Sequence, residues 1–546
     1  MNLVNNAVIN PPRPTNEPVF DYAPGSTEKI ALKKALAEMA TSQIEIPLVI
    51  GGKRVTTGNL GKVVMPHDHQ YVLASYHKAG PAEVQQAIDA AVAAQGEWRA
   101  FRWEERAGIF LKAAELLAVK YRAQMNAGSM LTGGKTVYQA EIDAACELID
   151  FLRFNAHYAR EIYEKQPESS TGVWNYVQQR PLEGFVFAVT PFNFTAIAGN
   201  LPTAPALMGN TVVWKPASSL VYTPWLFMQI LEEAGLPPGV INFVPGSGAT
   251  VGDVCLADPN LSGIHFTGST RVFQQMWKTI GENIDRYKSY PRIVGETGGK
   301  DFVMAHPSAD VDVLVTALVR GAFEYQGQKC SAASRAYIPR SLWPRVEAGL
   351  GKALDQVRMG PPTDFRNFVG AVIDKAAFKS ITAYIDYTHE NEGAEVIFGG
   401  DYNDAVGYFI EPTVILASDP KFRTMVEEIF GPVLTLYVYE DEAFEETLEL
   451  CDSSSMYALT GSIISRDRSA VGTAMAKLEN AAGNFYINDK PTGAVVGQQP
   501  FGGGRASGTN DKAGSAANLM RWVSTRTVKE TFVPPTDFGY PFMDEE

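Results

Sequence analysis

Cys330, Glu296 and Asn193 have side chains that could together carry out covalent chemistry on a carbonyl group. A thiolate adds to a carbonyl carbon and leaves an oxyanion on a tetrahedral centre. An asparagine amide can donate a hydrogen bond to that oxyanion, and losing such a donor typically raises the barrier by about 3 kcal/mol. A carboxylate shielded from water can act as a general base near neutral pH. The three residue types therefore fit a nucleophile, an oxyanion donor and a base.

Each of these residues also has an ordinary structural explanation. Cys330 could be a buried thiol, Asn193 could shape a turn after Pro191, and Glu296 could be a surface acid before two glycines. An unperturbed thiol has a pKa near 8.5 and is only a few per cent ionised at neutral pH. Lys329 is adjacent in sequence, but adjacency alone does not place its ammonium near the sulfur. The motifs that surround the three residues distinguish the catalytic explanation from the structural one.

Four motifs, in a fixed order, surround these residues. They are Pro191-Phe192-Asn193-Phe194, Glu296-Thr-Gly-Gly-Lys300, Gly327-Gln-Lys-Cys330 and Glu427-Glu428-Ile-Phe430-Gly-Pro432. Glu296 and Cys330 are 34 residues apart (330 − 296). In these motifs and their spacing the chain resembles the aldehyde dehydrogenase superfamily along nearly its whole length. The resemblance implies that Cys330 is the nucleophile, Asn193 the oxyanion donor and Glu296 the base for thioester hydrolysis.

The resemblance also implies which residues contact a dinucleotide. Lys215 would hold the adenosine ribose, Glu428 the nicotinamide ribose, and Phe430 would pack near the nicotinamide ring. Further positions that match the family's dinucleotide site are Thr190, Ser218, Gly252, Gly268 and Ser269. Many relatives have a glutamate at the position of Ser218, where it would repel a 2′-phosphate. A serine removes that repulsion and leaves NADP open, although NAD is expected because the nearer relatives use it.

Within the superfamily the chain is most similar to the branch that oxidises L-glutamate γ-semialdehyde, which is in equilibrium with 1-pyrroline-5-carboxylate, to L-glutamate in proline catabolism. Residues 323–331, 484–490 and 497–511 carry this similarity. The substrate residues that it implies are Ser331, Gly493 and Ala494 for the α-carboxylate, Glu147 for the α-ammonium, and Phe194 and Phe501 for the methylenes. Relatives often have serine at the position of Ala494, so only its backbone contact is carried over. Plain core packing is the alternative explanation for both phenylalanines.

Three other functions stay open at this point. The chain could oxidise an aldehyde without an α-carboxylate, pass its thioester to phosphate or coenzyme A, or be a non-catalytic relative. Glu296 disfavours acyl transfer, because hydrolysis is the step that needs a base. The combined presence of Cys330, Asn193 and Glu296 disfavours a binding or structural protein.

The elements that must position these residues alternate between strands and helices. Short apolar runs at residues 184–189, 211–214, 240–244 and 263–266 are separated by helical segments, which is typical of a doubly wound parallel sheet. Two glycine turns, at residues 246–252 and 266–270, follow strands of this sheet. Nucleotides bind such sheets at the carboxyl ends of the strands, beside helix N-termini.

Earlier in the chain, a helix is expected from Pro81, with Val84, Ile88 and Val92 on its buried face. Helices are also expected at residues 104–125 and 136–164, joined by a turn at Gly133-Gly134. The run Gly133-Gly-Lys-Thr136 resembles a phosphate loop, but Ser129 stands where the first glycine would be required. We therefore interpret it as a helix–helix turn.

The family fold implies α/β architecture with three parts. Residues 1–167 and 187–294 would form a Rossmann-like NAD-binding domain with an irregular N-terminal arm, and residues 295–508 an α/β catalytic domain. Residues 168–186 and 509–546 would form a small oligomerisation element, with β-rich stretches at 172–179 and 525–533. A homodimer or a dimer of dimers is expected.

Composition limits the other functional classes. The chain has 546 residues and a formal net charge of −14, from 47 basic and 61 acidic residues. This charge disfavours nucleic acid and anionic membranes as partners. The four cysteines form no CxxC pair and favour a reducing compartment, and the HxH at His67 and His69 lacks further ligands, so no metal is expected. No transit-peptide pattern is evident, which predicts a cytoplasmic protein, or a matrix protein in a mitochondrial setting.

Overall fold

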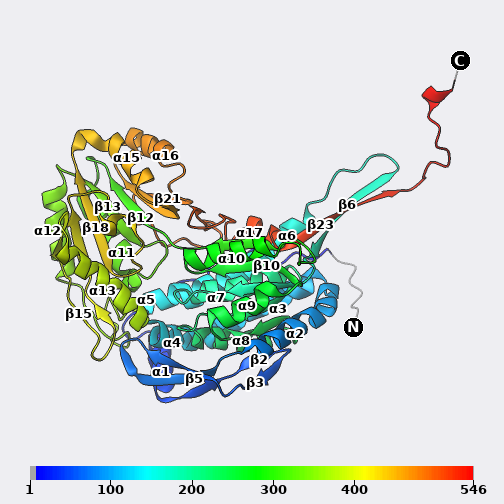
Figure 1. Ribbon diagram of the computed structural model, residues 1–546, viewed down its shortest axis with the longest axis horizontal. Coiled ribbons are helices and arrows are strands. Elements are labelled where there is room, and N and C mark those ends of the chain that lie inside the picture. Colours follow the sequence, from blue (N-terminus) through cyan, green and yellow to red (C-terminus); the bar gives the residue numbers. More distant parts are fainter. Residues whose placement is uncertain (1–7, 545–546) are drawn as a thin grey trace.

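The structure is a computed structural model that describes residues 8–544, and it contains two seven-stranded sheets flanked by helices (Figure 1). The strand order of the first sheet is β11-β10-β7-β8-β9-β2-β3, and that of the second is β14-β17-β18-β13-β12-β20-β21. Figure 1 shows the second sheet at one end of the molecule, with α7, α9 and α10 of the first sheet in the middle.

The first sheet is the doubly wound parallel sheet that the sequence predicts. Its parallel strands are β7(Phe185–Val189), β8(Thr211–Lys215), β9(Ile241–Phe243), β10(Leu261–Thr267) and β11(Arg292–Glu296). They are buried on both faces, which explains why they are nearly continuous apolar runs. The chain passes from β7 outward to β8 and β9 and then returns to the other side of β7 as β10. The strand order therefore reverses between β7 and β10, where such sheets bind dinucleotides.

Helices join and cover these strands. They are α7(Thr195–Leu207), α8(Tyr222–Ala234), α9(Gly248–Ala257), α10(Thr270–Glu282) and α2(Pro81–Ala100). Helix α2 begins at Pro81 and buries Val84 and Ile88, as predicted, while Val92 on the same face is partly buried against the same core. The antiparallel strands β2(Leu48–Ile50) and β3(Lys53–Val55) extend the sheet beyond β9.

The N-terminal part adds a small sheet and a helical layer. Its elements are α1(Thr27–Thr41), β1(Ile44–Ile46), β4(Leu60–Met65), β5(Asp68–His77), α3(Trp103–Glu115), α4(Arg122–Gly133), α5(Val137–Ala140) and α6(Leu148–Glu164). Two π-helical segments, η1(Leu116–Tyr121) and η2(Glu141–Glu147), continue the predicted helices at 104–125 and 136–164. The predicted turn is confirmed, because Gly134 ends α4 with φ +71°. A side chain there would meet the carbonyl oxygen of Ala371 at 2.7 Å.

The second sheet is also mainly parallel. Its strands are β12(Asp301–Ala305), β13(Ala333–Pro339), β17(Thr413–Ala417), β18(Val433–Tyr439), β20(Thr460–Ile464), β21(Asn484–Ile487) and the antiparallel edge strand β14(Ala394–Phe398). Its longer helices are α11(Val311–Phe323), α12(Trp343–Leu354), α13(Lys375–Glu390), α15(Phe444–Ser453) and α16(Arg468–Lys477). Shorter segments are η3(Glu324–Gly327), β15(Tyr402–Asn403), β16(Phe409–Ile410), α14(Arg423–Val426), η4(Asp441–Ala443), β19(Tyr457–Ala458), β22(Gly504–Arg505) and η5(Pro541–Met543).

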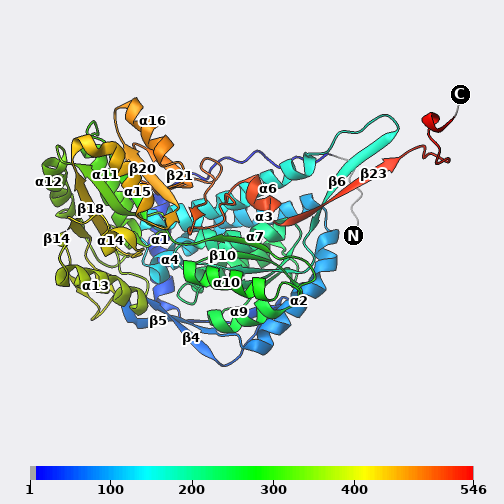
Figure 2. The same ribbon diagram turned by 45° about the horizontal axis from the view of Figure 1, so that its top comes forward.

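A two-stranded antiparallel ribbon leaves the body of the molecule (Figures 1 and 2). It consists of β6(Val173–Pro181) and β23(Val523–Thr531), so the two β-rich stretches of the sequence do form strands that pair. Just before β23, α17(Ala516–Met520) packs on α6, and Trp522 is buried in the core beneath the first sheet. Among residues 8–544, no helix is long and apolar enough to cross a membrane.

Candidate active site

Cys330 lies at the end of a buried loop between α11 and β13. The loop turns through Tyr325, Gln326 and Gly327, which have positive φ values of 54°, 56° and 65°. At Gly327 a Cβ would lie 2.1 Å from the carbonyl oxygen of Gly431, so only glycine fits. This tight turn brings Cys330 to the wall of a cavity of about 410 Å³.

The same cavity collects most of the catalytic and substrate residues predicted from the sequence. Those that line it are Glu147, Phe194, Glu296, Cys330, Ser331, Gly493, Ala494 and Phe501. Asn193 is buried next to it, and its Nδ2 donates to the carbonyl oxygen of Gln328 at 3.2 Å, two residues before the cysteine. Residues far apart in the sequence thus converge on one enclosed volume that could hold a small molecule.

Burial controls the ionisation of the thiol. It raises the pKa of Cys330 well above the ordinary value, and the nearby carboxylates of Asp301 and Glu296 raise it further. The ammonium of Lys329 pairs with the carboxylate of Glu324 at 3.2 Å. These surroundings favour the thiol over the thiolate, so a base or an added positive charge would promote ionisation.

Glu296 is the last residue of β11, and its carboxylate accepts the N–H of Gly503 at 3.0 Å. Burial raises its pKa well above the ordinary value, while that hydrogen bond and the charge of Lys512 lower it. A carboxyl group with a raised pKa in the same cavity as a thiol has the properties of a general base.

Another part of the cavity suits the charged end of an amino acid. The Ser331 Oγ lies 2.8 Å from the Thr492 Oγ1, next to the loop of Gly493 and Ala494. Glu147 lines the same cavity, and burial and the charge of Asp143 raise its pKa to about 8. A hydroxyl pair and backbone N–H groups can bind a carboxylate, and a buried glutamate can bind an ammonium.

The sequence did not identify two lysines that also line the cavity, Lys490 and Lys512. The Lys512 Nζ donates to the carbonyl oxygens of Gly483 and Gly502 at 2.7 and 3.1 Å. Lys490 is the last residue of the 484–490 stretch that carries the family similarity, but no role was predicted for it. Each lysine lies at or directly after the end of a stretch that carries the family similarity, and this position was the signal in the sequence that could have identified it.

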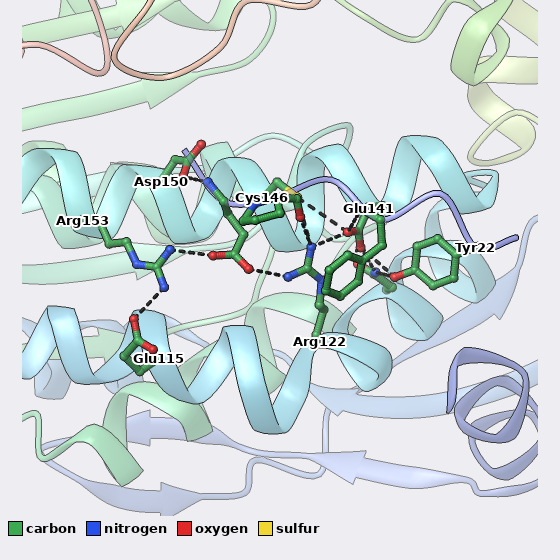
Figure 3. A network of polar contacts seen from close by, with 11 residues as sticks. Tyr22, Glu115, Arg122, Glu141, Cys146, Asp150 and Arg153 are labelled. Carbon is green, nitrogen blue, oxygen red and sulfur yellow. Dashed lines mark hydrogen bonds and ion pairs between the residues drawn. The ribbon is translucent and has the colours of Figure 1, made fainter. Parts of the chain in front are cut away.

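The N-terminal arm also borders the cavity, through Asn16, Glu17 and Val19. Asn16 Nδ2 donates both to Asp150 at 2.8 Å and to the carbonyl oxygen of Val496 at 2.7 Å. Arg122 and Arg153 both pair with Glu17 of the arm. Figure 3 shows the network around them, in which ion pairs reach Glu115 and Glu141 and the Tyr22 hydroxyl donates a hydrogen bond to Glu141. The part of the arm that the structure describes, from residue 8 onward, is irregular, as predicted, but hydrogen bonds from residues 16–22 hold it against the body of the protein, which its composition did not indicate.

The residues predicted to contact a dinucleotide lie mostly at the carboxyl ends of the first sheet. Thr190 and Gly268 follow β7 and β10, on the two sides of the strand-order reversal. Ser269 is the N-cap residue of α10, but its side chain makes no capping hydrogen bond. Ser218 Oγ donates to the carbonyl oxygen of Gly246 at 3.4 Å, and Gly252 lies in α9.

The properties of Lys215 and Glu428 indicate whether the predicted site could hold a dinucleotide. Lys215 ends β8, and burial alone lowers the pKa of its ammonium to about 8. Burial raises the pKa of Glu428 to about 7, and its Oε1 accepts the N–H of Gly299 at 2.9 Å. Phe430, at φ +58°, packs edge-on against Phe192. Lys215 is a buried donor at the carboxyl end of a strand, where such sheets bind dinucleotides, and both it and the Glu428 acceptor suit the hydroxyl groups of the two riboses of NAD.

Comparisons with known proteins agree with the site described above. A model of the aldehyde dehydrogenase family matches residues 55–528. The chain is 56% identical over 540 residues to a delta-1-pyrroline-5-carboxylate dehydrogenase, mitochondrial, from Dictyostelium discoideum, covering 98% of this chain and 97% of that one.

Solved structures agree. The crystal structure of the delta-pyrroline-5-carboxylate dehydrogenase from Mycobacterium tuberculosis bound with NAD superposes with a TM-score of 0.96 at 54% identity, covering 99% of this chain and 100% of that one. A 1-pyrroline-5-carboxylate dehydrogenase from Thermus with bound NAD gives a TM-score of 0.89 at 34% identity, covering 96% and 100%.

Proposed function

This chain belongs to the aldehyde dehydrogenase family, and on that basis we propose that it oxidises L-glutamate γ-semialdehyde to L-glutamate with NAD. The single observation that carries the substrate is that Cys330 shares its cavity with both Ser331 and Glu147. The thiol would attack the aldehyde while the other two hold the amino-acid end. The relatives at high identity, which are named for 1-pyrroline-5-carboxylate, support the same substrate.

The reaction follows from the side chains around the sulfur. The Cys330 thiol first loses its proton to water, and the thiolate then adds to the aldehyde carbon. The resulting oxyanion accepts hydrogen bonds from the Asn193 amide and the Cys330 N–H. NAD, when bound, supplies the acceptor for the hydride that leaves this carbon. The carbon is then a thioester carbonyl. Glu296 removes a proton from water as the water attacks, and the C–S bond breaks to give glutamate and the free thiol.

Cofactor contacts are assigned to this chain's own residues. We propose that Lys215 donates to the adenosine ribose, that Glu428 accepts from the nicotinamide ribose, and that Phe430 packs near the ring. Thr190, Gly268, Ser269, Ser218 and Gly252 line the path between them. The lowered pKa of Lys215 supports this assignment, because a buried ammonium is stabilised by new acceptors.

The substrate has charges at one end and an aldehyde at the other. Ser331 and the N–H groups of Gly493 and Ala494 would hold the α-carboxylate, and Glu147 the α-ammonium. Phe194 and Phe501 would pack on the methylene groups between them. The positions of these residues around one cavity support the assignment over core packing for the two phenylalanines.

The decisive experiment follows NADH absorbance with 1-pyrroline-5-carboxylate and either NAD or NADP. We expect turnover with NAD, and glutamate as the only acyl product, with or without coenzyme A and phosphate. A panel of aldehydes that lack the α-carboxylate serves as the control. Faster turnover of any of these aldehydes would contradict the proposed substrate, and an acyl-coenzyme A product would contradict hydrolysis.

We further propose that the β6–β23 ribbon, in residues 168–186 and 509–546, joins copies of the chain into a dimer or a dimer of dimers. Trp174 on the ribbon is 54% exposed and Phe532 just beyond it 59%, and such aromatic side chains suit an interface. Light scattering of Trp174→Asp should show a smaller assembly than the unmodified chain, and an unchanged mass would contradict the assignment.

We also retain the division into an NAD-binding domain, residues 1–167 and 187–294, and a catalytic domain, residues 295–508. A cytoplasmic location fits four buried, free cysteines. The name of the Dictyostelium relative includes "mitochondrial", so the mitochondrial matrix is the second location to test. Cell fractionation would distinguish it from the cytoplasm.

A further inference from the structure

Helix α7 begins immediately after Asn193 and Phe194, and it lacks a cap of its own. Its N-cap residue is Phe194, which has no side-chain acceptor for the first N–H groups of the helix. The carboxylate of Asp143, 52 residues earlier in the sequence, takes this place. Its two oxygens accept the N–H groups of Thr195 at 2.9 Å and Ala196 at 2.8 Å.

Asp143 has no exposed surface, and a buried carboxylate requires a counter-ion. Lys135 supplies it, with 2.5 Å between its Nζ and the Asp143 Oδ2. The ammonium also lies 4.4 Å from the ring centroid of Phe194 and 4.6 Å from that of Tyr325. Lys135 is the lysine of the Gly133–Thr136 run that superficially resembles a phosphate loop. Its charge is used inside the protein.

These contacts connect the two halves of the reaction centre. On one side, Asp143 and Lys135 hold the turn that carries Asn193. On the other, Lys135 contacts Tyr325, and the Gln326 Nε2 donates to the carbonyl oxygen of Gly134 at 3.0 Å, on the loop that leads to Cys330.

We infer that Asp143, with Lys135 as its counter-ion, is a positioning residue that fixes the Asn193 amide over the carbonyl oxygen during the reaction. An oxyanion donor works only when it is held in advance near the position of the developing charge. A displacement of about 1 Å can cost on the order of 10²-fold in rate. A phenylalanine at the N-cap serves the substrate cavity, so the cap has to come from another segment.

The inference rests on the proposed aldehyde oxidation, and the test uses propanal and NAD. Propanal has no ammonium, so changes at Glu147, one helical turn from Asp143, do not enter. In the full chain, Asp143→Asn keeps the shape but places an amide against either the helix N–H groups or the Lys135 ammonium. We expect the first NADH burst to slow by about 10- to 100-fold. Alkylation of Cys330 by iodoacetamide, which forms no oxyanion, should change less than about twofold.

A second comparison isolates the pathway through Asn193. In a chain that already carries Asn193→Ala, adding Asp143→Asn should slow the burst less than about twofold further, because the donor that it positions is gone. The inference would be overturned if the effects of the two substitutions on the burst rate multiplied. It would also be overturned if Asp143→Asn slowed the burst and the alkylation equally, since Asp143 would then be only a structural cap. A burst unaffected by Asp143→Asn would overturn it as well.

Asp467→Asn is the matched control, since Asp467 caps α16 through Ser469 at 2.8 Å and Ala470 at 3.4 Å in the same manner. It should lower the Tm and leave the burst unchanged. If Asp143→Asn does not fold, Lys135→Arg replaces it, because this substitution keeps the positive charge but changes its shape. It should likewise slow the NADH burst and leave the rate of alkylation nearly unchanged. An unmodified chain that forms no NADH with any aldehyde would instead refute the proposed function itself.

Discussion

The Glu296 carboxylate accepts a hydrogen bond from the Gly503 N–H at 3.0 Å, and this contact joins the end of the first sheet to the glycine-rich segment after the second. A side chain on Gly502 would lie 3.1 Å from the other oxygen of Glu296. The glycines therefore leave space for the carboxylate at the cavity wall. Burial raises its pKa, so the group can accept a proton from water and release it afterwards.

Glu296→Gln should separate the two halves of the reaction. The amide cannot accept the proton of the attacking water, so thioester hydrolysis should slow by about 10²- to 10⁴-fold. Attack by Cys330 and hydride loss do not use this group directly. Stopped-flow measurements should therefore show one NADH per site in a fast burst, followed by a slow steady state. Loss of the burst with hydrolysis still fast would contradict the assignment.

Cys330→Ala should abolish dehydrogenation, with a decrease of at least about 10³-fold, because the variant lacks the thiol that forms the proposed covalent adduct. NAD binding, measured by calorimetry, should stay within about twofold, since the sulfur is not among the proposed contacts of the riboses. Cys451→Ala is the control, because Cys451 is buried in the core of the second sheet. That variant should lose some stability and keep its turnover. Persistent NADH formation by Cys330→Ala would refute the nucleophile.

The sequence predicted those parts of the molecule that local patterns specify. The strands of the first sheet are buried on both faces, so their apolar runs were readable, and the turn at Gly134 requires a positive φ that glycine adopts easily. We predicted Cys330 and Glu296 as nucleophile and base because the four ordered motifs around them resemble those of the aldehyde dehydrogenase superfamily. Both residues line the same cavity, an arrangement that the sequence alone could not establish.

Long-range polar contacts were not predictable in the same way. Asp143 caps a helix that begins 52 residues later, and no periodicity relates the two segments. Asn16 reaches Val496, 480 residues away, from an arm whose composition is typical of an irregular segment. Such contacts depend on the packing of several elements at once, so local propensity carries no information about them.

Ser331→Ala should weaken recognition of the carboxylate without changing the chemistry. The substitution removes the hydroxyl that lies 2.8 Å from that of Thr492. The substrate carboxylate would then lose one hydrogen bond to a charged group, worth about 1.5–3 kcal/mol. The kcat/KM for L-glutamate γ-semialdehyde should fall by about 10- to 100-fold, while that for propanal stays the same. Equal losses for both aldehydes would indicate a general effect on Cys330 next to it, and would contradict a role in specificity.

Glu147 should make the binding of an ammonium ligand depend on pH. Burial raises its pKa to about 8, so below this pH the free site holds a neutral acid and above it a carboxylate. An ammonium favours the carboxylate, so binding at lower pH requires the loss of a proton, and affinity should rise as the pH approaches 8 and then level off. The other charged groups near Glu147 are Asp143, Lys135, Asp150 and Lys329.

Competitive inhibition by L-glutamate and by glutarate, which lacks the ammonium, measures this effect. The ratio of the glutarate Ki to the glutamate Ki cancels the ionisation of Cys330, Glu296 and the lysines, which act on both ligands. It should increase between pH 6.5 and 8 by up to about tenfold per pH unit. Glu147→Gln should make the ratio small and independent of pH. A ratio that is already flat in the unmodified enzyme would show that the ammonium binds elsewhere, because a group with a raised pKa cannot bind a cation without titrating.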